Sequence, residues 1–107
     1  MTRLIVGCGY LGRRVAQAWR SAGHAVAALT RWPEKADQLA SAGLQPLLAD
    51  LTASAPLRPL PAASVVLFAV ARDRGSTADL RQLYVEGLLR VVAALPALPE
   101  RFILISS

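Results

Sequence analysis

The chain has 107 residues, of which 54% are hydrophobic and only 6% aromatic. This length predicts a single domain, residues 1–107, which is short for an enzyme with separate cofactor and substrate lobes. The net charge of +5 comes from basic residues scattered along the chain. Because they form no basic block and alternate with no aromatic residues, we expect no nucleic-acid partner.

The apolar runs and the cysteine count exclude further classes of protein. The longest apolar run, Val65–Ala71, is far shorter than the roughly 20 residues of a membrane span, so we expect no membrane association. Glycines interrupt the first apolar stretch and arginines follow it, unlike a signal peptide, so we expect a cytoplasmic protein. A lone cysteine, Cys8, and one histidine favour neither a disulfide nor a metal site.

The first half of the chain alternates apolar strands with amphipathic stretches. Leu4–Val6 predicts a first strand, and His24–Leu29 predicts a second. Between them, apolar residues recur at helical spacing: Leu11, Val15, Ala18, Trp19 and Ala22. Pro33 suits the first turn of a second helix that ends near Gly43, and Gln45–Asp50 predicts a third strand.

The second half repeats the alternation after a loop with three prolines at residues 52–64. Val65–Val70 predicts a buried strand, and residues 101–107 supply a fifth. Ser76 and Asp79 form a capping box before a helix. The predicted inner face of that helix consists of Leu80, Leu83, Tyr84, Gly87, Leu88, Val91 and Leu95.

This order predicts an α/β fold, a doubly wound parallel sheet of the Rossmann type with helices on both faces. We expect strand order 3-2-1-4-5 and a ligand crevice between the first and fourth strands, where the winding reverses. The fifth strand is apolar on both faces and has no neighbour on its outer side. We therefore expect self-association through the edge at residues 101–107.

The stretch GCGYLG after the first strand carries the spacing G-x-G-x-x-G. In this context Gly7 would make the tight turn, Gly9 would admit a pyrophosphate, and Gly12 would allow close packing of the helix. The alternative is that the glycines only shape a turn. The pattern predicts a dinucleotide cofactor.

Thr30 and Arg31 follow the second strand, where NAD-dependent enzymes usually carry an acidic residue. A carboxylate would repel a 2′-phosphate, whereas Arg31 can pair with it and Thr30 can donate its hydroxyl, so NADP is favoured over NAD. The alternative is a solvated arginine. Asp50 can accept a hydrogen bond from the adenine amino group while Leu51 packs on the ring, or it caps a loop. The small residues Ala69, Val70 and Ala71 leave room for the inner ribose.

Together, IVGCGYLG, LTR, AD-L, LFAVA, LYVEGLLRVVAAL and RFILISS resemble the atypical extended short-chain dehydrogenase/reductases, the group similar to NAD-dependent epimerases and dehydratases. The resemblance covers the whole chain. The cofactor contacts that it implies are Gly7, Gly9, Tyr10, Leu11, Gly12, Arg31, Asp50, Leu51, Ala69 and Ala71.

The resemblance also implies a catalytic Ser or Thr after the paired serines that close strand five, followed by a Y-x-x-x-K pair. Neither Tyr10 nor Tyr84 has a lysine four residues later. We therefore expect the cofactor-binding part of a longer reductase or epimerase, catalytically incomplete by itself, with an unknown small-molecule substrate. One alternative is a nucleotide-sensing module of the type that regulates potassium transport, although such modules usually carry an acidic residue at the position of Arg31. Another is an interaction domain that has lost its nucleotide, which the retained glycines disfavour.

Overall fold

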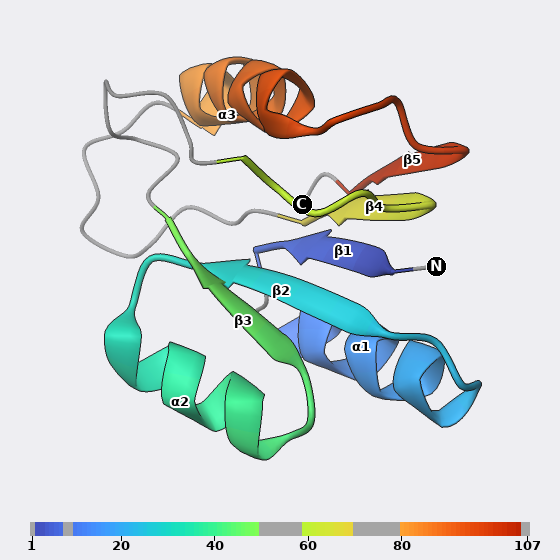
Figure 1. Cartoon of the computed structure of the whole chain (residues 1–107). Coiled ribbons are helices and arrows are strands. Elements are labelled where there is room, and N and C mark those ends of the chain that lie inside the picture. The colour runs from blue at the N-terminus through green and yellow to red at the C-terminus, as the bar shows by residue number, and fades with distance from the viewer. Residues whose placement is uncertain (1, 8–9, 50–58, 70–79, 106–107) are drawn as a thin grey trace.

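The computed structural model describes residues 2–7, 10–49, 59–69 and 80–105, with the backbone alone for residues 10 and 80–84. It contains five strands and three helices (Figure 1). The strands are β1 (Arg3–Val6), β2 (Val26–Thr30), β3 (Gln45–Leu48), β4 (Val65–Phe68) and β5 (Arg101–Leu104). The helices are α1 (Tyr10–Ser21), α2 (Pro33–Ser41) and α3 (Leu80–Ala94).

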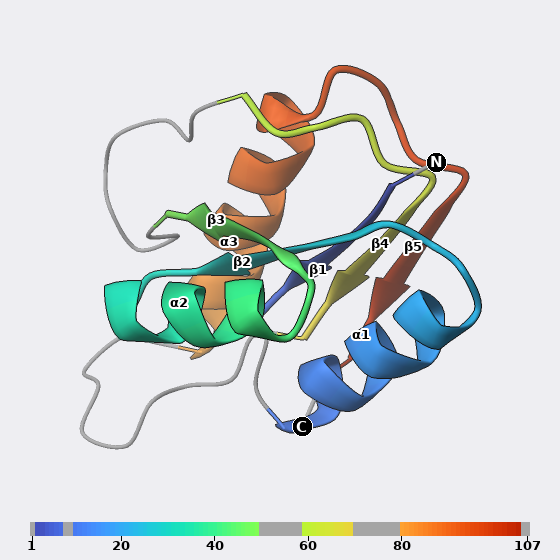
Figure 2. The same ribbon diagram turned by 60° about the horizontal axis from the view of Figure 1, so that its bottom comes forward.

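The strands form one parallel sheet in the order β3-β2-β1-β4-β5, which confirms the predicted topology. Helices α1 and α2 cover one face of the sheet, and α3 covers the other (Figures 1 and 2). The winding therefore reverses between β1 and β4. Val6, at the end of β1, pairs with Leu29 of β2 and Phe68 of β4.

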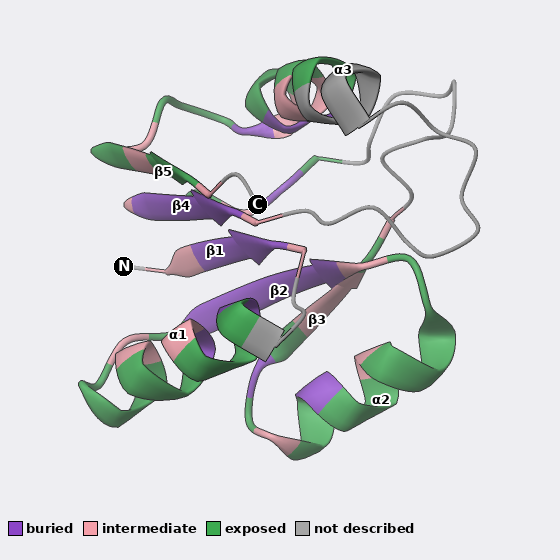
Figure 3. Cartoon of the chain, turned by 180° about the vertical axis from the view of Figure 1, so that it is seen from behind, coloured by how far each residue is buried: buried purple, intermediate pink, exposed green. Residues whose placement is uncertain are grey.

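Apolar clusters lie on both faces of the sheet because the central strands are buried on both sides (Figure 3). On the α3 face, Phe68 and Val91 are fully buried, and Leu95 extends the same cluster. On the other face, Ile5 packs with Ala16 of α1 and Leu39 of α2. Among the described side chains, none that is polar or charged is buried. No helix in the described ranges is long and apolar enough to cross a membrane.

The apolar residues that recur at helical spacing along α1 pack on the sheet only in part. Leu11, Ala18 and Ala22 are exposed, whereas Gly12 and Ala16 are buried against the sheet. Val15 and Trp19 are half-buried and pack beside them. The helix turns its smallest residues inward because its backbone comes close to β1, so larger apolar residues lie at the sides.

The predicted inner face of α3 is confirmed where its side chains are described. Gly87 and Val91 are buried, and so is Leu95 just after the helix, while Leu88 is half-buried. Ser76 and Asp79, the predicted capping box, lie outside the described residues. The opposite side of α3 is also apolar, with Val85 and Leu89 exposed.

Candidate functional site

The carboxyl ends of β1, β2 and β4 bring three predicted site residues into one row. Gly7, Thr30 and Ala69 lie at or next to the register partners Val6, Leu29 and Phe68. The backbone N–H of Ala69 donates to the carbonyl oxygen of Val6 at 2.9 Å, which fixes the end of β4 against β1. Open α/β sheets bind ligands at this edge, where the winding reverses.

The turn between β1 and α1 depends on two of the three glycines. Gly7 has a φ of +87°, a conformation that side chains other than glycine rarely adopt. A Cβ on Gly12 would lie 2.9 Å from the carbonyl oxygen of Gly7 and 3.3 Å from Cγ2 of Ile5. The first turn of α1 therefore packs directly on the loop that leaves β1. That close approach puts the N-terminus of α1 at the edge of the sheet, where backbone N–H groups favour an anion.

Hydrogen bonds at Thr30 tie the end of β2 both to the start of α2 and to the residue that follows β3. The backbone N–H of Trp32 donates to Oγ1 of Thr30 at 3.2 Å, and the N–H of Ala49 donates to the carbonyl oxygen of Thr30 at 2.9 Å. Trp32 is the N-cap residue of α2, with extended backbone and Pro33 directly after it. The Thr30 hydroxyl thus has a structural role that the sequence did not reveal, and its own hydrogen stays available to donate.

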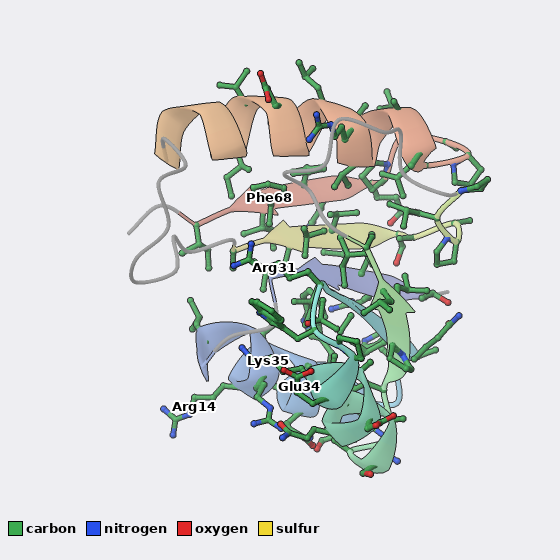
Figure 4. All side chains as sticks on the ribbon, turned by 90° about the vertical axis from the view of Figure 1, so that its left-hand side faces the viewer. Arg14, Arg31, Glu34, Lys35 and Phe68 are labelled. Carbon is green, nitrogen blue, oxygen red and sulfur yellow. The ribbon has the colours of Figure 1, made fainter. Side chains whose placement is uncertain are left out.

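Arg31 stacks on the indole ring of Trp32, with its guanidinium carbon 4.6 Å from the ring centroid. Both side chains are exposed. Arg31 directly follows Thr30, the last residue of β2. Figure 4 shows Glu34 and Lys35 lower than Arg31, on α2. The Arg31 side chain therefore starts from the carboxyl edge of the sheet.

The structure thus describes only some of the predicted site residues. Leu11 and Arg31 are exposed, Gly7, Thr30 and Ala69 are half-buried, and Gly12 is buried. Tyr10 begins α1, and its side chain is not described. Five predicted residues lie outside the described ranges: Gly9, Asp50, Leu51, Val70 and Ala71.

Trp32 is a residue of this site that the sequence analysis did not single out. Its signal was the order Arg-Trp-Pro at a strand-to-helix junction, because an aromatic residue next to an arginine can stack on it. Two further basic side chains, Arg13 in the first turns of α1 and Lys35 in the first turn of α2, are exposed. The described residues contain no cluster of three or more His, Cys, Asp or Glu side chains that could hold a metal ion.

Residues 3–94 match the family model of the TrkA-N domain, which is most of the chain. The chain belongs to the TrkA-N domain family. TrkA-N domains are nucleotide-binding domains of the Rossmann type whose ligand is usually NAD(P), so the predicted dinucleotide partner is confirmed at the level of NAD(P). The match is broader than the resemblance to short-chain dehydrogenase/reductases and does not identify that narrower group.

Two solved structures share the fold of this TrkA-N domain. One is a conserved protein of unknown function from Silicibacter pomeroyi DSS, with a TM-score of 0.53 and 24% identity over 89% of this chain and 32% of that chain. The other, from Enterococcus faecalis, is named as a candidate 2-dehydropantoate 2-reductase, with a TM-score of 0.53 and 12% identity over 99% of this chain and 46% of that chain. The TrkA-N domain thus spans less than half the length of either protein. No curated protein sequence matches it.

Proposed function

We propose that this chain is the NADP-binding domain of an oxidoreductase, of the short-chain reductase or epimerase/dehydratase-like type. The observation that carries the proposal is the position of Arg31. It follows Thr30 at the carboxyl end of β2, where an acidic residue would select NAD, and its exposed side chain starts from the edge at which open α/β sheets bind ligands. A guanidinium there can form charge-assisted hydrogen bonds to a 2′-phosphate.

The remaining residues fit the other parts of the cofactor. The turn at Gly7 and the N-terminus of α1 suit the pyrophosphate. In the proposal Asp50 and Leu51 contact the adenine, and the small residues that follow β4 leave space for the inner ribose. When bound, the cofactor supplies hydride chemistry. This chain binds and orients it, and we assign no catalytic residue because neither tyrosine is followed by a lysine four positions later.

Calorimetric titration of the chain with NADPH and with NADH tests the proposal. Arg31→Ala removes a charge-assisted pair worth on the order of 1.5–3 kcal/mol, so the preference for NADPH should fall roughly tenfold or more. Arg101→Ala is the matched control, because Arg101 is exposed at the start of β5, at the opposite end of the strands. Equal affinity for the two cofactors in the unaltered chain would overturn the proposal.

A second candidate function is a regulatory module that senses the nucleotide without reacting with it. The match to the TrkA-N family is equally consistent with this function. A sensor of NADH would bind NADH at least as tightly as NADPH, and Arg31→Ala would then leave the ratio of the two affinities unchanged. The same titration therefore separates the two candidates.

We also propose that the chain associates with a second copy of itself. On β5, Ile103 is 40% exposed and Leu104 is 56% exposed, and among the described strands β5 pairs only with β4. An apolar sheet edge of this kind offers backbone N–H and carbonyl groups to a second chain.

A further inference from the structure

The indole ring of Trp32 lies under the guanidinium of Arg31, and this contact bears on how the chain would choose its cofactor. We propose that Trp32 is a positioning residue that sets the preference for NADPH by holding Arg31 in place. This inference rests on the proposed function, because it concerns the same 2′-phosphate. It adds a residue that neither binds the phosphate itself nor belongs to the glycine motif.

The backbone around Trp32 is fixed from both sides. Its N–H donates to Oγ1 of Thr30, and its carbonyl oxygen accepts hydrogen bonds from the N–H groups of Lys35 at 3.1 Å and Ala36 at 3.0 Å. Pro33 restricts the next φ angle. The indole ring therefore projects from a rigid helix start and not from a pliable loop.

A fixed ring matters because an exposed arginine side chain has many rotamers. A ligand that pairs with such a side chain must overcome the loss of that rotamer freedom. The stack at 4.6 Å restrains Arg31 before any ligand arrives.

Glu34 is the acidic residue in the first turn of α2, and Figure 4 shows it well below Arg31. A second arginine, Arg3, lies over the ring of Trp19 at 5.1 Å, but it belongs to the start of β1, at the opposite end of the strands. The contact between Arg31 and Trp32 is the one of these two that lies after the carboxyl end of a strand.

A double-mutant cycle tests the proposal with NADPH and NADH as ligands, measured by calorimetry. Trp32→Ala should weaken NADPH binding about two- to five-fold and leave NADH binding unchanged. Trp32→Phe should restore most of the loss, since phenylalanine also presents a ring face. In the Arg31→Ala background, Trp32→Ala should have no further effect on the ratio of the two affinities. Glu34→Gln is the control and should leave that ratio unchanged.

The outcomes separate this inference from the proposed function. A loss of the NADPH preference in Arg31→Ala but not in Trp32→Ala overturns the positioning role and leaves the function standing. Equal weakening of both cofactors by Trp32→Ala also overturns it, because that pattern indicates a structural role at the start of α2. Equal affinity for NADPH and NADH in the unaltered chain overturns both.

Discussion

At Gly12 the first turn of α1 approaches β1 so closely that a single methyl group decides the packing. A Cβ there would lie 2.9 Å from the carbonyl oxygen of Gly7, which itself has a positive φ. In an ordinary helix, alanine is favoured over glycine by about 1 kcal/mol, so the substitution would stabilise the chain if space allowed. Whether Gly12→Ala raises or lowers the free energy of unfolding therefore tests how closely α1 approaches the turn at Gly7.

We expect Gly12→Ala to lower the free energy of unfolding by about 1–3 kcal/mol, as overpacking of a filled site does. Urea unfolding followed by circular dichroism measures the change. Gly23→Ala is the comparison, because Gly23 has a φ of +91° but no atom within 4 Å of an added Cβ. Its cost comes from backbone strain alone, about 1 kcal/mol. A gain in stability for Gly12→Ala would mean that the turn relaxes.

At the scale of single elements, α3 shows how a helix can be apolar on two sides and still have one inner face. Val91 is fully buried, while its neighbour Val92 is 36% exposed. The two residues have the same side chain and the same helical propensity, and they differ in burial. Only the buried one contributes a full set of contacts to the cluster under α3.

Val91→Ala should therefore lower the free energy of unfolding by about 1–3 kcal/mol, because it removes buried methyl groups and leaves a cavity. Val92→Ala should change it by less than about 1 kcal/mol, since little contact is lost at a partly exposed site. Chemical denaturation of both variants gives the comparison. Equal losses would show that the outer side of α3 is covered in solution.

At the scale of the whole molecule, the two edges of the sheet differ in their capacity to pair. Strand β3 carries Pro46, which has no N–H to donate to a neighbouring strand. Strand β5 has no proline and exposes Ile103 and Leu104. Association between copies of the chain should therefore involve β5 more than β3.

Two lysine substitutions compare these edges under matched conditions. Leu104 is 56% exposed on β5, and Leu48 is 57% exposed on β3. We expect the sedimentation coefficient of the unaltered chain to rise with concentration. Leu104→Lys should suppress that rise, because a charge on an edge strand opposes pairing, whereas Leu48→Lys should leave it unchanged. A chain that sediments as a monomer at every concentration would contradict the prediction.

The sequence predicted the fold best where the rules for connecting strands allow few topologies. The alternation of apolar runs and helical stretches predicts parallel strands, and right-handed crossovers then leave the order 3-2-1-4-5. On α1, periodicity located the helix but did not say which of its apolar residues contact the sheet. Leu11 belongs to the apolar series and is exposed, whereas its neighbour Gly12 packs closely, as the glycine spacing predicted.

The sequence by itself determined the sheet, its topology and the glycine turn, since these depend on local conformation and on short-range order along the chain. Only the tertiary structure decided which residues share the carboxyl edge. Gly7, Thr30 and Ala69 are far apart in the chain, and the register of β1 with β2 and β4 brings them into one row. The contact between Arg31 and Trp32 was also visible only in the tertiary structure, because the side chains of neighbouring residues can project in different directions. The rigid start of α2 fixes the direction of Trp32.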